Sequence, residues 1–349
     1  MYRLTTSTRA GRITGAAAVV LALALVALPA VAPRALIQDL FTILTLLTLA
    51  QLWNLLAGYG GLVSVGQQAF VGIGAYALFA GVILLGWNPV AAILLGGLAA
   101  LVLAVPTAFF AFRLQGAYFA IGTWVIAEVT RLLVAQWKTL GGGTGTSLPR
   151  EATSAILGTD LVRALFGVRE AAARDIVAYW LALALAVAVI AGIYWLLRNR
   201  LGLALAAVRD NPEAAGAVGV DVRRLKWAVF LIASAATGLV GALVFMQTAR
   251  ISPNAAFAVT DWTAYVIFIV VIGGIGTVEG PILGVIVFYV LRSALADYGT
   301  WYLMTLGVVA IAVMLFAPKG LWGSISARGN LHLFPIRRRL VGPKIEGGI

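Results

Sequence analysis

Long apolar stretches separated by short polar segments run along almost the whole chain of 349 residues. A transmembrane helix needs about 20 consecutive, predominantly apolar residues, and this chain offers such stretches repeatedly. The pattern predicts an all-α integral membrane protein, a single domain over residues 1–349 with about ten transmembrane helices. The expected spans lie at about 13–33, 36–56, 62–85, 89–112, 116–136, 176–197, 226–248, 262–274, 279–296 and 300–317.

Two of these expected spans have unusual ends. The first follows three arginines and ends in small residues, as a cleavable signal peptide does. Its apolar part is long and a second hydrophobic stretch follows at once, so we interpret it as an uncleaved helix. The eighth runs into the glycine-rich segment Gly273-Gly274-Ile275-Gly276-Thr277, which predicts a break or re-entrant turn. Such irregular backbone is tolerated at membrane depth where protein or water satisfies it.

Composition excludes several classes of protein. The chain is 62% hydrophobic and 11% charged, with a mean hydropathy of +1.01, whereas soluble proteins are near one quarter charged. There is no cysteine, and the single histidine, His332, lies in the polar C-terminal tail. We therefore expect no disulfide and no metal site. The net charge of +12 is explained by basic cytoplasmic loops, so nucleic acid is not an expected partner.

The distribution of basic residues predicts the orientation in the membrane. Of the 25 Lys and Arg residues, 16 fall on the side that holds both termini and seven on the opposite side. Basic residues concentrate in cytoplasmic loops. We therefore expect both termini, the 198–225 loop and the basic tail at 318–349 to be cytoplasmic, and the long 137–175 loop to lie on the other side.

The loop at 198–225 contains a candidate docking helix for a partner protein. Asp210 or Asn211 can cap a helix N-terminus, and Pro212 suits the first helical position. Small side chains follow, and a short helix of small residues can enter a groove on another protein. An ordinary amphipathic connector is the alternative. The candidate residues are Arg209, Asp210, Asn211, Pro212, Glu213, Ala214, Ala215, Gly216 and Gly219.

Other polar residues lie inside the expected spans. Glu128 and Arg131, three positions apart, share a helix face and can pair. They line a solute path or gate, or they form a structural pair near the outer interface. Ser64, Gln67 and Gln68 could line a path or make interhelical hydrogen bonds. Gly273, Gly274 and Gly276, in the glycine-rich segment, are candidates for the same two roles.

Several motifs in one order resemble a known family. Glu213-Ala214-Ala215, followed after three residues by Gly219, resembles the E-A-A-x-x-x-G loop with which importer permeases dock on their ATPase subunits. Other matching segments are 60–76, 115–120, 141–145, 273–277 and 280–281, so the resemblance covers about residues 50–290. Together they resemble the permease family of ATP-binding-cassette (ABC) importers for branched-chain amino acids. The generic loop continues to an I-x-L-P ending that this chain lacks, as that family does.

The resemblance implies a permease subunit in the bacterial inner membrane, with the 137–175 loop periplasmic. It implies transport of branched-chain amino acids, or of related solutes such as urea and short amides. The implied partners are a second homologous permease, two cytoplasmic ATPase subunits and a periplasmic solute-binding protein. No phosphate-binding loop of the form G-x-x-x-x-G-K-[ST] occurs in the sequence. ATP and Mg²⁺ are therefore expected on partner subunits, and no cofactor is expected in this chain.

Two other classes of protein have less support in the sequence. An ion-coupled secondary transporter or channel usually needs intramembrane carboxylates. Only Glu128 lies deep in an expected span, because Asp261 and Glu279 lie near span edges. A membrane-embedded enzyme would need a convergent cluster of His, Cys or carboxylate residues, and no such cluster is visible. We therefore expect a transport subunit that is not itself an enzyme.

Overall fold

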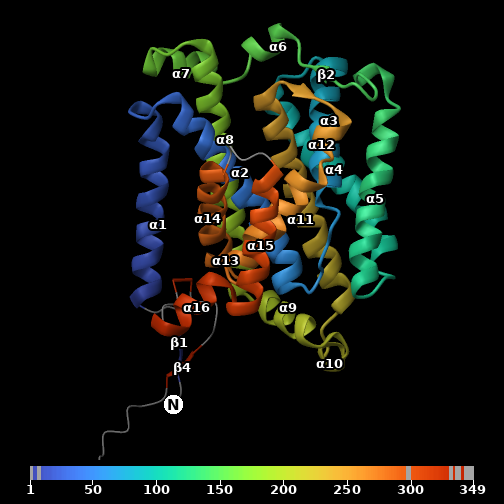
Figure 1. The fold of residues 1–349 in the computed structure, drawn as a ribbon, viewed down its shortest axis with the longest axis vertical. Helices are drawn as coiled ribbons and strands as arrows, with labels where there is room; N and C mark the ends of the chain where they lie inside the picture. The colour runs from blue at the N-terminus through green and yellow to red at the C-terminus, as the bar shows by residue number, and fades with distance from the viewer. Residues whose placement is uncertain (1–2, 6–8, 296–299, 330–332, 335–338, 342–349) are drawn as a thin grey trace, which may run out of the picture.

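The computed structural model describes residues 3–5, 9–295, 300–329, 333–334 and 339–341, and it is built almost entirely of helices (Figure 1). A helix occupies each of the ten expected positions. These ten are α1 (Arg9–Ala27), α2 (Arg34–Asn54), α3 (Gln67–Leu85), α4 (Pro89–Ala111), α5 (Ala117–Ala135), α8 (Glu170–Arg198), α11 (Val222–Thr248), α13 (Tyr265–Gly273), α14 (Glu279–Leu295) and α15 (Thr300–Phe316). His332 lies outside the described residues.

Shorter elements connect these helices. They are η1 (Leu28–Ala30), η2 (Leu55–Tyr59), η3 (Lys138–Leu140), α6 (Arg150–Ser154), α7 (Thr159–Phe166), α9 (Arg200–Asp210), α10 (Pro212–Ala217), α12 (Pro253–Ala256), η4 (Thr260–Ala264) and α16 (Gly320–Gly329). Eight helical segments of the described chain are long and apolar enough to cross a membrane, judged by length and composition. The apolar segment Thr14–Ala30 and the 17-residue α14 are slightly shorter.

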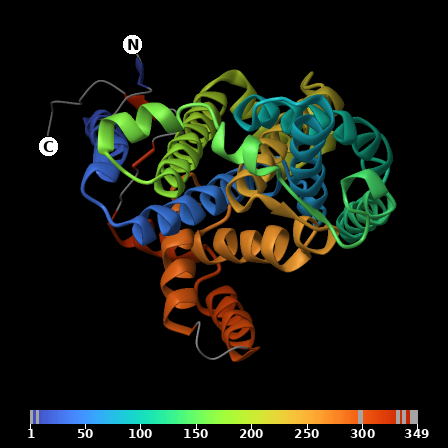
Figure 2. The same cartoon turned by 90° about the horizontal axis from the view of Figure 1, so that it is seen from above.

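The core lies between helices that are distant in the sequence. α3, α4 and α11 pack closely together, and α2 packs against α8 and α13. Figure 2 shows the C-terminal helices α14 and α15 projecting from one side of the bundle, with α5 at an edge. α1, α4, α5 and α15 expose many large apolar side chains. An apolar outer surface is what a bilayer requires, because lipid and not water surrounds these faces.

Several expected boundaries differ from those observed, among them the starts of the third and eighth spans. The third span begins at Gln67 instead of 62, because side chains take up the backbone groups before it. The Val65 amide donates to Thr123 Oγ1 at 3.1 Å, and Trp53 Nε1 donates to the Ser64 carbonyl at 2.8 Å. The eighth span begins earlier than expected, with α12 and the π-helical turn η4 leading into α13.

Two short strand pairs show which connections lie at the same end of the molecule. β1 (Arg3–Thr5) pairs with β4 (Arg339–Val341), which brings both terminal regions together. β2 (Thr146–Ser147) pairs with β3 (Arg250–Ile251), which joins the long 137–175 loop to the end of α11. In Figure 1, β1, α9, α10 and α16 lie at one end and α6, α7 and β2 at the other. The segments expected on opposite sides of the membrane therefore lie at opposite ends of the molecule, and which end faces the cytoplasm stays a prediction.

The orientation can be tested with single cysteines, because the native chain contains none. Ser147→Cys and Ala217→Cys introduce exposed thiols at opposite ends of the molecule. In intact cells, we expect a membrane-impermeant thiol reagent to label the residue at 147 and to label the residue at 217 only after lysis. The reversed labelling pattern would contradict the orientation.

Candidate functional site

The short helix α10 is fixed at its N-terminus by Asn211. Its side-chain oxygen accepts hydrogen bonds from the amides of Glu213 and Ala214, both at 3.0 Å. These bonds satisfy two of the free N–H groups that every helix start leaves. Asp210, the other candidate cap, instead forms an ion pair with Arg209 at 2.9 Å.

The C-terminus of α10 is also capped by hydrogen bonds. The Gly219 amide donates to the Gly216 carbonyl at 3.0 Å, and the Val220 amide donates to the Ala215 carbonyl at 3.1 Å. Gly219 has a φ of +90°, a left-handed conformation that glycine adopts without strain. This is a Schellman motif, and Gly219, one of the candidate residues of the loop, occupies its left-handed position.

Only one face of α10 is available to a partner. Ala215 is 2% exposed and belongs to the same apolar cluster as Val208 and Leu225 of this chain. Ala214, Gly216, Ala217 and Val218 are exposed, and nothing lies within 4 Å of a Cβ placed on Gly216. Figure 1 shows α10 at the end of the molecule that also holds α9 and α16. Ala215, expected among the docking residues, therefore packs inward.

Arg209 also points into the molecule. Its Nη1 donates to the Gly58 carbonyl at 3.1 Å. Gly58 lies in the π-helical turn η2, which follows directly after α2. Arg209 Nε and Nη2 bind Asp210 Oδ1 at 3.0 and 2.9 Å. A residue predicted as part of the docking loop thus connects that loop to the membrane helices.

The glycine-rich segment between α13 and α14 is a break in the helix, as the sequence predicts. Gly274 and Gly276 have φ values of +128° and +76°, which interrupt the helical backbone. Side chains of α2 satisfy the freed groups. Asn54 accepts from the Gly276 amide and donates to the Thr277 carbonyl, each at 2.8 Å, and Gln51 donates to the Val278 carbonyl at 2.7 Å.

Gly58 brings the Arg209 contact and the helix break together. A Cβ at Gly58 would lie 2.6 Å from the Gly276 nitrogen, so only glycine permits this approach of two backbones. Gln51, Asn54 and Gly58 were not identified from the sequence. A signal was present, because Gln51 and Asn54 are amide side chains three positions apart near the end of an expected span.

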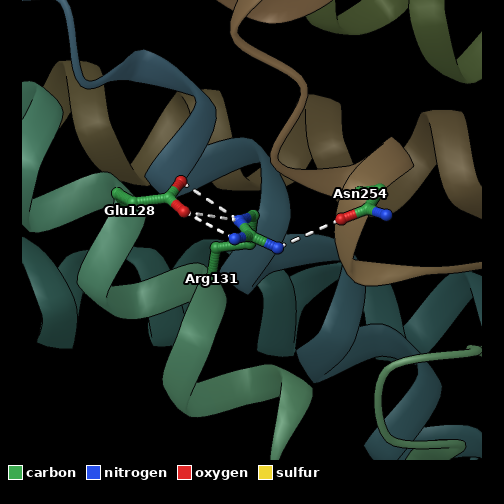
Figure 3. A network of polar contacts seen from close by, with 3 residues as sticks. All are labelled: Glu128, Arg131 and Asn254. Atoms are coloured by element: carbon green, nitrogen blue, oxygen red, sulfur yellow. Dashed lines mark hydrogen bonds and ion pairs between the residues drawn. The ribbon is translucent and has the colours of Figure 1, made fainter.

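Glu128 and Arg131 form the pair that their spacing predicts (Figure 3). Arg131 Nε lies 3.0 Å from both Glu128 carboxylate oxygens, and Nη2 lies 2.5 Å from Oε1. Arg131 Nη1 also donates to Asn254 Oδ1 at 3.0 Å, which links α5 to α12. The Glu128 side chain is 44% exposed and that of Arg131 is 25% exposed. The pair therefore lies at a surface of this chain, and Asn254 is a partner that spacing along one helix could not reveal.

Three other candidates bind their neighbours. Gln67 donates to the Leu49 carbonyl at 3.2 Å, and the Thr263 hydroxyl donates to Gln68 Oε1. Ser64 Oγ accepts from the Gly66 amide at 3.2 Å. All three candidates are buried. Of the two roles that the sequence left open, these contacts correspond to interhelical and backbone support.

Comparison with known proteins gives one family. A family model described as "Branched-chain amino acid transport system / permease component" matches residues 35–318. The high-affinity branched-chain amino acid transport system permease protein LivM of Escherichia coli is 32% identical over 284 residues, which is 77% of this chain and 65% of that relative. The LivM of Salmonella typhimurium is 31% identical over 282 residues, again 77% of this chain and 65% of the relative.

The matches extend beyond these two proteins. A probable branched-chain amino acid transport permease protein LivM from Methanocaldococcus jannaschii is 29% identical over 156 residues, covering 41% of this chain and 45% of the relative. The chain spans about 65% of the length of the first curated relatives that it matches. No solved structure matches it.

Replacing Arg209 should loosen the link between the loop and the membrane helices. Arg209→Gln removes a charge-assisted hydrogen bond to the Gly58 carbonyl, and such bonds contribute about 1.5–3 kcal/mol when shielded. Because Arg209 is partly exposed, we expect a loss on the order of 1 kcal/mol, seen as a lower midpoint of thermal unfolding. Arg200→Gln, an exposed site on the same helix, is the matched control and should change nothing. Equal midpoints for both variants would show that the Gly58 contact contributes no stability.

Replacing Glu128 alone should reduce the amount of folded protein more than replacing both Glu128 and Arg131. Glu128→Gln leaves Arg131 charged, and a lone charge inside a span costs up to about 2.5–3.5 kcal/mol, the value at the bilayer centre on insertion scales. We expect less folded protein in membranes, measured as monodisperse yield after solubilisation, and partial recovery in Glu128→Gln/Arg131→Gln. Asp160→Asn, which breaks an exposed pair of the same spacing with Arg163 at 3.8 Å, should have no effect. If none of these variants differs from the native chain, the Glu128–Arg131 pair has no structural role.

Proposed function

The chain belongs to the family of branched-chain amino acid transport permeases, and from this membership we propose its function. It is the membrane-spanning permease subunit of an ABC importer in the bacterial inner membrane. It moves branched-chain amino acids, or related small solutes such as urea and short amides, into the cytoplasm. A second homologous permease, two ATPase subunits and a periplasmic solute-binding protein complete the assembly.

The family match carries the proposal, and the geometry of α10 supports it. α10 is closed at both ends and projects from the side that the basic residues assign to the cytoplasm. Its exposed residues Ala214, Gly216 and Ala217 leave room for a close approach by another protein. A connector between two membrane helices has no need of such a surface.

The contacts of Arg209 suggest how movement of α10 would reach the membrane. ATP binding to the partner subunits displaces the docking loop, and Arg209 connects this loop to Gly58. Gly58 lies against Gly276, in the break between α13 and α14. A break is a natural hinge, because its backbone is held by the side chains of Gln51 and Asn54 and not by a helical ladder. Alternating access then follows from two arrangements of these packed elements.

A secondary transporter would use a carboxylate in or beside the membrane helices; such residues include Asp261, Glu279 and the partly exposed Glu128. The Glu128 carboxylate accepts three hydrogen bonds from Arg131 and is therefore occupied. An ion-coupled mechanism would need a carboxylate free to bind a proton or a cation.

Reconstitution in liposomes tests the proposal. We expect uptake of leucine, isoleucine or valine only when the ATPases, the binding protein and ATP are all present. Gly216→Trp and Ala217→Trp should lower solute-stimulated ATP hydrolysis at least tenfold, because overpacking an interface costs about 1–3 kcal/mol. Leu157→Trp, at an exposed site on the opposite side, is the control and should leave hydrolysis unchanged.

The choice of positions for these variants follows from the structure. Ala215 is buried within this chain, and Gly219 needs its positive φ, so bulky residues at either position would disturb folding as well as docking. Uptake by this chain alone, driven by a proton or sodium gradient, would contradict the importer proposal. Full stimulated hydrolysis in both α10 variants would show that α10 is not the docking element.

A further inference from the structure

Two adjoining crevices lie where the end of α4 meets the start of α11. One has a volume of about 610 Å³ and is lined by Asp221, Arg223, Arg224, Trp227, Ala228 and Leu231. The other has a volume of about 360 Å³ and is lined by Ala108, Phe109, Phe112, Arg113, Arg223 and Trp227. Because they share Arg223 and Trp227, we treat them as one surface, the α4–α11 crevice.

The α4–α11 crevice is positively charged. Asp221 is committed to its own helix, where it accepts from the Arg224 amide at 2.9 Å and pairs with the Arg224 side chain at 3.0 Å. Arg113 lies over the Phe109 ring, 4.3 Å from its centre. Within the described part of the chain, neither Arg113 nor Arg223 takes part in an ion pair. Both guanidinium groups are therefore available to an anion.

An apolar surface continues from this charged crevice along α4. Val102, Val105 and Phe109 are spaced three and four residues apart, so they share one helix face. They are 65%, 47% and 45% exposed. Phe109 also lines the crevice, so the cationic site and the apolar stripe are continuous. Such a surface matches a molecule with an anionic head and a hydrocarbon chain.

The position of the crevice is that of a lipid headgroup. α11 begins next to α10, at the end of the molecule that carries α9 and α16. Trp227 packs edge-on against Phe112, with ring centres 5.9 Å apart. Tryptophan is enriched at the boundary between membrane and water. The cytoplasmic leaflet also carries anionic lipids, which attract basic residues close to the membrane.

We propose that the α4–α11 crevice binds one anionic phospholipid of the cytoplasmic leaflet. Arg113 and Arg223 hold the phosphate, and an acyl chain lies along Val102, Val105 and Phe109. The proposal depends on the cytoplasmic position of α10 and on no particular solute. A different transported solute would leave this lipid-site proposal intact. Failure of the lipid site would in turn leave the solute assignment intact.

Lipid titration of the purified full-length chain in detergent tests the site. The probes are phosphatidylglycerol, phosphatidylcholine and inorganic phosphate, and bound lipid is counted by native mass spectrometry. We expect the native chain to retain one phosphatidylglycerol in preference to phosphatidylcholine. Arg113→Gln/Arg223→Gln should weaken that binding roughly thirtyfold, since each basic residue near an anionic surface contributes about fivefold to affinity.

Matched variants distinguish the loss of positive charge in the crevice from a loss of folding and from charge removal elsewhere at the same end of the molecule. Arg113→Lys/Arg223→Lys keeps both charges and should retain most of the affinity. Arg200→Gln/Lys319→Gln removes two exposed charges from the same end of the molecule and should bind as the native chain does. The proposal is overturned if phosphatidylcholine binds equally well, if inorganic phosphate competes as a free anion at equal concentration, or if the Gln and Lys variants lose affinity alike. Exclusion of lipid by a second copy of the chain over this face would also overturn it.

Discussion

Inside a bilayer no water is available to the backbone, so every N–H and C=O that leaves a helix must find a partner within the protein. This constraint organises the centre of the molecule. The chain stops being helical between α13 and α14, and the amide side chains of Gln51 and Asn54 take up the freed groups. Two polar residues in an apolar helix are costly unless bonded, and here each is matched to a backbone group. The break between α13 and α14 and the helix α2 therefore depend on each other.

The 198–225 loop is connected to this centre through a small number of contacts. Arg209 crosses from the loop to the Gly58 carbonyl, and Gly58 has no side chain to separate it from Gly276. The capped helix α10 lies at one end of this series of contacts. The glycines of the break, Gly274 and Gly276, which have positive φ angles, lie at the other end. A displacement applied at α10 has a short, bonded route to the only backbone of α13 and α14 that is not held by a helical ladder.

The arginines illustrate how one residue type serves different purposes by position. Arg131 is neutralised by Glu128 within the span and reaches Asn254 on another helix. Arg209 bonds inward to a carbonyl, since a guanidinium can satisfy a buried acceptor while part of it remains hydrated. Arg113 and Arg223 line the α4–α11 crevice without an ion-pair partner in the described chain, so an external anion would be attracted there.

The sequence by itself determined the elements that depend on local chemistry. The ten helix positions follow from the length of each apolar stretch, the start of α10 from Pro212 with a cap at Asp210 or Asn211, and the Glu128–Arg131 pair from its spacing. Only the tertiary structure decided which way these residues face. Ala215 packs inward, Arg209 reaches Gly58, and Gln51 and Asn54 meet a segment more than 200 positions away. The physical reason is that helix formation and capping are settled within a few residues, whereas the partner of a side chain is set by packing between distant helices. One apolar stretch does not specify which of its faces meets which neighbour.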